Sequence, residues 1–309
     1  VPYSVGACVM LRFCLYLSLA LAPRSALADV PKVVTDIPIV QSLVAEVMGD
    51  LGSPAVLVGG GADAHAYQLR PSEARALAGA DLVVWIGPEM TPWLGRVLSA
   101  APDVQVTGLL ASKGTTLRNF ADADGTAVID PENHDHAGID PHAWLDPGNA
   151  DTWLAVIANE LSTADPEHAA IYRQNAEEAV KRTADLAAEL DGILARSQDR
   201  PIVVGHQAYG YFAQRFGLRI VASIESGDAA APGAARLSEI AALVKSAGVG
   251  CLFPEVGQDP KRAGVLIEGS AAKLGAPLDP EGRTLDLGPG LYPTLMRNLA
   301  EAIAACQSQ

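Results

Sequence analysis

An uninterrupted helical pattern in the middle of the chain limits the possible folds more than any other feature of the sequence. The stretch from Asp165 to Ser197 opens with Asp-Pro, which suits the start of a helix, and its single glycine is Gly192. Small and apolar residues recur in it at intervals of four and three, namely Tyr172, Ala176, Ala179, Thr183, Leu186, Leu190 and Ile193. A helix of about 32 residues would measure about 48 Å. It could join two lobes as a rigid connector, or it could be a long surface helix of one domain.

On each side of this helix, short β-branched runs alternate with alanine-rich helical stretches, which is typical of parallel sheets covered by helices. The predicted strands form two sets of four: 32–36, 54–58, 82–86 and 104–108, then 201–205, 219–223, 250–253 and 276–279. We therefore predict an α/β protein with two lobes, each a roughly four-stranded parallel sheet flanked by helices, joined by one long rigid helix. The expected boundaries are residues 29–164, 165–198 and 199–309.

The first 28 residues resemble a cleavable export signal. Arg12 precedes an apolar run from Phe13 to Ala22, and the segment ends in Ala26-Leu27-Ala28. The apolar run is too short to span a bilayer permanently. We expect residues 1–28 to be removed and the protein to be released into the periplasm.

The chain is acidic, with a formal net charge of −14. Phosphate backbones are bound by clustered Lys and Arg, so we expect no nucleic-acid partner. An acidic surface attracts cations over a distance, although it also serves simply to keep a protein soluble.

Two cysteines remain beyond the signal segment, Cys251 and Cys306. An isolated pair in an exported protein predicts a disulfide bond, which would tie down the C-terminal segment. Two buried free thiols are the alternative.

Three histidines stand at the ends of predicted strands or in the loops that follow them: His65, His142 and His206. Asp279 ends the last predicted strand. Ligands of open α/β sheets bind at the carboxyl ends of strands, so these side chains could converge there. Three imidazoles and one carboxylate form a four-coordinate set that suits Zn²⁺. Taken singly, a histidine in a loop is usually only a polar surface residue, and the three gain weight only together.

Several blocks in the same order resemble the cluster A-I solute-binding proteins of ABC importers, which carry zinc, manganese and iron. The blocks are Ala64-His65-Ala66-Tyr67 with Leu69-Arg70-Pro71-Ser72, Asp140-Pro141-His142-Ala143-Trp144-Leu145-Asp146-Pro147, His206-Gln207-Ala208-Tyr209-Gly210-Tyr211-Phe212, and Phe253-Pro254-Glu255. The resemblance implies a metal in the cleft between the lobes, with His65 and His142 from the first lobe and His206 and Asp279 from the second. It implies Zn²⁺ as cargo, because manganese carriers tend to have Glu at the third ligand position. It also implies delivery to the membrane permease of an ABC importer.

The sequence leaves some details of this site open. Asp63, Glu255 or a water is the alternative to Asp279 as fourth ligand, and Asp140 and Asp146 are candidates for orienting the imidazoles. The segment His134-Asp135-His136 is a candidate second zinc site or a solvated polar loop.

Three other functions compete with zinc capture. A manganese or iron carrier would use the same fold. A secreted zinc hydrolase would need an open coordination position and a general base, which no motif supplies, so we expect no enzymatic activity. A surface adhesin is the third. We expect a monomer, loaded directly or by a periplasmic zinc chaperone.

Overall fold

The computed structural model describes residues 1, 3, 30–101, 104–120, 138–225 and 232–308. Within these ranges the chain forms two separate four-stranded sheets, and every strand pair in both is parallel. The predicted fold class is therefore confirmed. The predicted cleavage site at residues 26–28 lies outside the described residues.

The N-terminal sheet has the strand order β2-β1-β3-β4. Its strands are β1 (Val33–Thr35), β2 (Ala55–Val56), β3 (Leu82–Trp85) and β4 (Gln105–Gly108). The helices between them are α1 (Pro38–Met48), the short 3₁₀ turn η1 (Gly49–Leu51), α2 (Pro71–Ala78) and α3 (Pro92–Leu98). All three α-helices begin with proline, whose missing N–H costs nothing in the first turn.

The C-terminal sheet repeats this arrangement in the order β6-β5-β7-β8. Its strands are β5 (Ile202–His206), β6 (Ile220–Glu225), β7 (Cys251–Phe253) and β8 (Lys273–Leu274). Its helices are α6 (Gly210–Phe216), α7 (Ala234–Ser246) and α8 (Pro260–Ile267). Alternate residues of β5 face opposite sides of this sheet: Ile202 and Val204 join the main core, whereas Val203 joins a smaller core.

The last strand lies earlier than predicted. Residues 276–279 were expected to form it, but β8 is Lys273–Leu274, and Leu278 makes only an isolated bridge to Glu255. Pro277 cannot donate a ladder hydrogen bond, which prevents a regular strand at this point. The isolated bridge still brings Asp279 to the same sheet edge as the other strand ends.

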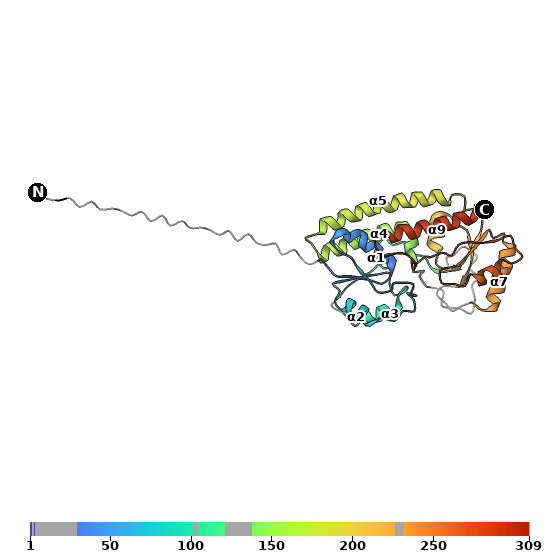
Figure 1. Ribbon diagram of the computed structural model, residues 1–309, viewed down its shortest axis with the longest axis horizontal. Helices are drawn as coiled ribbons and strands as arrows, with labels where there is room; N and C mark the ends of the chain where they lie inside the picture. Colours follow the sequence, from blue (N-terminus) through green and yellow to red (C-terminus); the bar gives the residue numbers. More distant parts are fainter. Residues whose placement is uncertain (2, 4–29, 102–103, 121–137, 226–231, 309) are drawn as a thin grey trace.

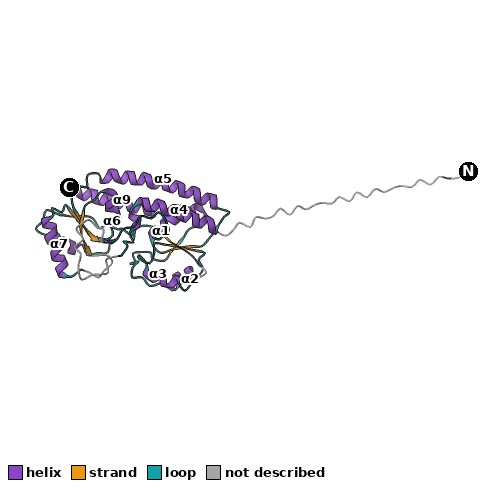
Figure 2. Cartoon of the chain, turned by 180° about the vertical axis from the view of Figure 1, so that it is seen from behind, coloured by secondary structure: helices purple, strands orange, loops and turns teal. Residues whose placement is uncertain are grey.

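One layer of helices runs along both lobes (Figures 1 and 2). It consists of α1, α4 (Pro147–Ala164), α5 (Ala169–Leu194) and α9 (Leu291–Gln307), and α5 packs against the other three. Six of the seven predicted stripe residues of α5 are buried, and Ile193 packs against the same core. The helix starts at Ala169 because Asp165 ends α4 instead, and its carboxylate binds the backbone N–H and the ring of His168.

The main hydrophobic core is continuous between the lobes. It contains N-terminal residues such as Val83, helical-layer residues such as Leu190, and C-terminal residues such as Phe212. The smaller core lies between the outer face of the C-terminal sheet and helices α7 and α8. Because the lobes share one core, their relative displacement disturbs close packing.

Among the described residues, no helix is long and apolar enough to cross a membrane.

The predicted disulfide is confirmed: Cys251 of β7 is bonded to Cys306 near the end of α9. A reciprocal pair of hydrogen bonds lies beside it, since the Arg200 guanidinium donates to the Gln307 carbonyl and the Gln307 amide donates to the Arg200 carbonyl. At its other end α9 contacts the N-terminal lobe, where the Tyr292 N–H donates to Ser42 Oγ. The disulfide thus fixes one end of a helix that spans both lobes.

We expect the double variant Cys251→Ser/Cys306→Ser to lose about 2–5 kcal/mol of unfolding free energy, because the unfolded chain is no longer constrained by the closed loop. Denaturant unfolding monitored by circular dichroism measures this loss. Reductant should destabilise the wild-type protein and leave the double variant unchanged. Equal sensitivity of the two proteins to reductant would contradict the expectation.

A buried carboxylate joins two strand ends in the N-terminal lobe. Asp36 follows β1 and is 0 % exposed. Its oxygens accept backbone hydrogen bonds of 2.9 Å from Ile37 and from Ile86, and the Thr91 hydroxyl donates at 3.4 Å. Burial raises the pKa of Asp36 to about 7, although these hydrogen bonds act in the opposite direction.

This pKa predicts a pH-dependent stability difference between the wild type and Asp36→Asn. Below about pH 4 the carboxyl is protonated in both the folded and the unfolded protein, whereas at higher pH only the folded protein keeps its proton, up to about pH 7. Wild-type stability should therefore fall relative to that of the variant as the pH rises from about 4 to about 7. Unfolding curves at several pH values test this, with a substitution at the exposed Asp50, Asp50→Asn, as the control. A difference that stays constant with pH would contradict it.

Candidate metal centre

His142 is held by a buried carboxylate two residues before it. It directly precedes the 3₁₀ turn η4 (Ala143–Leu145), which leads into α4, and it is 0 % exposed. Asp140 Oδ1 accepts the His142 backbone N–H at 3.0 Å and lies 2.8 Å from His142 Nδ1. The other face of the ring packs near Trp144, with ring centroids 5.2 Å apart. Asp140 is therefore the residue that orients this imidazole.

Asp146, the other carboxylate considered for this purpose, has a different contact. Its Oδ1 accepts the backbone N–H of Gly148 and caps the start of α4.

His206 is held in the same way from the other lobe. It is the last residue of β5, and its Nδ1 lies 2.6 Å from Glu255 Oε1. The Tyr209 hydroxyl donates to the same oxygen at 2.7 Å. Burial raises the pKa of Glu255, but the charge of His206 and hydrogen bonds from His206 and Tyr209 outweigh it, so this pKa lies below its ordinary value. Glu255 is thus a buried hydrogen-bond acceptor for the Tyr209 hydroxyl and the partner of His206 Nδ1.

The two imidazoles meet edge to edge. His142 Nε2 and His206 Nε2 are 3.3 Å apart, and the ring centroids are separated by 5.1 Å. Because Nδ1 of each ring is engaged by a carboxylate, Nε2 is the nitrogen that each ring directs toward the other lobe. The pair is therefore built from both lobes.

His65 lies beside this pair on the loop between β2 and α2. Its ring is half-buried, with its centroid 6.0 Å from that of His142. The loop is fixed just before the histidine: Asp63 Oδ1 accepts the His65 backbone N–H at 2.9 Å, and Trp93 Nε1 donates to the Ala64 carbonyl at 2.8 Å. The structure thus brings all three predicted histidines to one place.

Asp279 directly follows Leu278, the residue of the isolated bridge to Glu255, and its carboxylate closes a turn. Oδ1 accepts the Arg283 backbone N–H, and Oδ2 accepts both the backbone N–H and the hydroxyl of Thr284, at 2.9 and 2.7 Å. Among the described residues, no three His, Cys, Asp or Glu side chains are positioned to hold a metal ion together. The preformed part of the site is the His142–His206 pair, and the segment His134-Asp135-His136 lies outside the described residues.

Sequence reasoning considered Glu255 only as an alternative ligand, and its contact with His206 was missed. The sequence does contain a signal for it, because Glu255 lies just beyond β7, and β7 pairs with the strand that ends in His206. Charges at this edge also act on Tyr209, whose pKa is raised by burial and by Glu255, Asp279 and Glu281.

Two parallel α/β lobes on a shared helical layer, with imidazoles from both lobes in contact, define a metal-binding solute-binding protein. The family model described as "ZnuA: Zinc-uptake complex component A periplasmic" matches residues 33–306. The chain therefore belongs to the ZnuA family, which confirms the family resemblance seen in the sequence. This family is a periplasmic transport component of zinc uptake and not an enzyme.

Individual relatives agree with this assignment. The high-affinity zinc uptake system protein ZnuA of Paracoccus denitrificans is 43% identical, over 94% of this chain and 95% of that protein. A crystal structure of ZnuA has a TM-score of 0.75 at 25% identity and covers 90% of this chain and 100% of its own. A laminin-binding adhesin of Streptococcus agalactiae has the same TM-score at 26% identity, covering 90% and 99%.

The packing around Gly205 predicts that a single methyl group there disturbs the site. A Cβ at this position would lie 2.7 Å from Gln258 Oε1 and 2.8 Å from Glu255 Cγ. We expect Gly205→Ala to displace Glu255, to cost about 1–3 kcal/mol of stability and to weaken zinc binding. Thermal unfolding and zinc titration measure the two effects.

Gly192→Ala is the matched control, because nothing lies within 4 Å of its Cβ position on α5. It should stabilise the protein by roughly 0.5–1 kcal/mol and leave zinc binding unchanged. Equal zinc affinity in the two variants would contradict the proposed role of this packing.

Proposed function

We propose that the protein captures Zn²⁺ between its lobes through His65, His142, His206 and Asp279 and delivers it to the permease of an ABC-type zinc importer. The observation that carries this proposal is the 3.3 Å separation of His142 Nε2 and His206 Nε2. Nitrogen ligands of tetrahedral Zn²⁺ lie roughly 2.0–2.1 Å from the metal, so two of them are about 3.3–3.4 Å apart. The observed separation equals one edge of such a tetrahedron.

The donor types support zinc over manganese or iron as cargo. Three imidazole nitrogens suit Zn²⁺, whereas Mn²⁺ prefers carboxylate and other oxygen ligands. Both buried acids beside the rings, Asp140 and Glu255, contact Nδ1 and leave Nε2 for the metal. A manganese or iron carrier is the alternative within the same class of protein.

Asp279 is the proposed fourth ligand. To reach the metal, Oδ2 must exchange its hydrogen bonds from Thr284 for a metal–oxygen bond. A water is the alternative occupant of this position. Asp63 and Glu255 are the remaining alternatives; Asp63 accepts the His65 backbone N–H, and Glu255 contacts Nδ1 of His206.

Other parts of the proposal rest on the sequence alone. Removal of residues 1–28 releases the protein into the periplasm, where it acts as a monomer. The segment His134-Asp135-His136 is the candidate second, weaker zinc site. A periplasmic zinc chaperone is a candidate donor of the metal, as an alternative to direct capture.

Zinc titration of the wild type and of His65→Ala, His142→Ala, His206→Ala and Asp279→Ala tests the ligand set. The wild type should bind one tight equivalent, and each substitution should weaken it because a coordination bond is lost. The loss should be largest for His142 and His206, which form the preformed pair. Competition with Mn²⁺ in the same titration tests the choice of metal.

Thr284→Val separates the two candidates for the fourth position. If Asp279 binds the metal, removal of the competing hydroxyl should tighten zinc binding, whereas a water ligand predicts no change. Unaltered zinc affinity in Asp279→Ala would remove Asp279 from the set. A wild-type protein without tight zinc would overturn the proposal.

A further inference from the structure

Glu255 has the contacts expected of a residue that controls a neighbouring imidazole. Its Oε1 lies 2.6 Å from His206 Nδ1 and 2.7 Å from the Tyr209 hydroxyl oxygen. All three residues are buried, with exposed fractions of 9 % for Glu255, 7 % for His206 and 1 % for Tyr209. A carboxylate that is shielded from water in this way is a strong acceptor.

The backbone around Glu255 keeps the carboxylate in place. Glu255 forms the isolated bridge with Leu278, and its own N–H donates to Gln258 Oε1 at 2.9 Å. The Glu255 side chain also packs against Gly205: a Cβ atom at that position would lie only 2.8 Å from Glu255 Cγ. The Tyr209 hydroxyl then fixes the rotation of the carboxyl group itself. Glu255 cannot turn away from His206 without breaking several of these contacts.

This contact selects one tautomer of His206. Glu255 Oε1 already accepts the Tyr209 hydroxyl hydrogen, so its 2.6 Å contact with His206 Nδ1 is a hydrogen bond when the imidazole carries its proton on Nδ1. The other nitrogen, Nε2, then carries a lone pair, and this is the atom that faces His142 at 3.3 Å. A proton on Nε2 would block a metal ion from that position.

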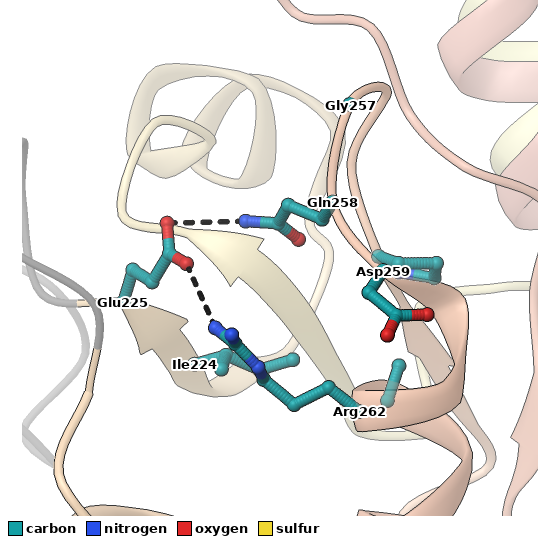
Figure 3. Close-up of a pocket in the computed structure, with 8 residues that line it drawn as sticks. Ile224, Glu225, Gly257, Gln258, Asp259 and Arg262 are labelled. Carbon is teal, nitrogen blue, oxygen red and sulfur yellow. Dashed lines mark hydrogen bonds and ion pairs between the residues drawn. The ribbon is translucent and has the colours of Figure 1, made fainter.

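A second glutamate in the same lobe has no such contact. Glu225 is the register partner of His206 across β5 and β6, but its carboxylate is turned away. Figure 3 shows it directed into a small pocket, where it accepts from Gln258 Nε2 at 3.1 Å and lies 3.8 Å from the Arg262 guanidinium. Strand register alone therefore does not identify the glutamate that holds His206.

We infer that Glu255, locked by Tyr209, is a positioning residue that holds His206 in the Nδ1–H tautomer and so prepares Nε2 for the metal. The inference rests on the proposed function in that it takes His206 as a zinc ligand. It adds a residue that sets zinc affinity without touching the metal. It also places a second acid at the proposed site: the Glu255 carboxylate lies beside the His206 ring, in addition to the carboxylate of the proposed ligand Asp279.

The test uses long-range proton–nitrogen NMR of the isotope-labelled, metal-free protein at neutral pH, with the His206 signals assigned by comparison with His206→Gln. In the wild type His206 should be protonated on Nδ1. In Glu255→Met the acceptor is lost, and the Nε2–H tautomer should appear. In Glu255→Gln the amide oxygen still accepts, so the Nδ1–H tautomer should be largely retained.

Zinc affinity should follow the same order. Glu255→Met should bind zinc roughly 10- to 100-fold more weakly, as is usual when the hydrogen-bond partner of a metal-binding histidine is removed. Glu255→Gln should lose less, and the matched control Glu225→Gln should match the wild type in both tautomer and affinity. Circular dichroism establishes that each variant is folded.

The outcomes separate this inference from the proposed function. An unchanged His206 tautomer in folded Glu255→Met overturns the positioning role even if the wild type binds zinc tightly. Equal loss of affinity in Glu225→Gln and Glu255→Met also overturns it. A wild type that binds no zinc but shows the expected tautomer change in Glu255→Met overturns the proposed function and supports the positioning role.

Discussion

The fixed spacing of the two lobes is the constraint on which the rest of the structure depends. His142 and His206 come from different lobes, so the 3.3 Å between their Nε2 atoms is set by how the lobes pack. Helices α5 and α9 contact both lobes, and one hydrophobic core runs through them. Hydrogen bonds between the lobes add to this packing. Trp144 Nε1 donates to the Pro280 carbonyl, and the Tyr211 hydroxyl donates to the Asp140 carbonyl. A metal-binding pair can therefore exist before the metal arrives, which lowers the ordering cost of binding.

Electrostatics explains why this pair tolerates burial. A neutral imidazole without a partner would leave a polar nitrogen unsatisfied, and a bare dication in an apolar cleft would be costly. Asp140 and Glu255 address both problems, because each lies within hydrogen-bond distance of Nδ1 of one ring and places a carboxylate beside the proposed site. The aromatic neighbours Trp144 and Tyr209 pack beside the rings and shield these contacts from water. These two carboxylates thus orient the rings, and the proposed ligand Asp279 would bring a third carboxylate to the metal itself.

The strands, the long helix and the positions of the three histidines were predictable because each depends on a local pattern. Short β-branched runs indicated the strands, the intervals of four and three indicated the helix, and the predicted strand ends located the histidines. The details that were missed depend on distant contacts. Pro277 moved the last strand to Lys273–Leu274, and the carboxylate of Asp165 joined His168 instead of opening the helix. The pairing of Glu255 with His206 spans 49 residues of sequence, and no local pattern specifies such a contact. The turn at Asp279 was not predicted either, because Thr284, which donates to its carboxylate, lies in a loop without a periodic sequence pattern.

The division of the proposed site between the lobes would link metal binding to lobe position. Zinc–nitrogen distances vary by only about 0.2 Å in well-formed sites, so with His142 and His206 as ligands a larger displacement of one lobe would break one of the two bonds. Bound zinc therefore opposes such a displacement, and a displacement imposed from outside weakens zinc by the same free energy, because linkage is reciprocal. The shared core makes large displacements costly, but a shift of a few tenths of an ångström requires little repacking. The same fold can consequently bind zinc tightly and release it after a small displacement of one lobe.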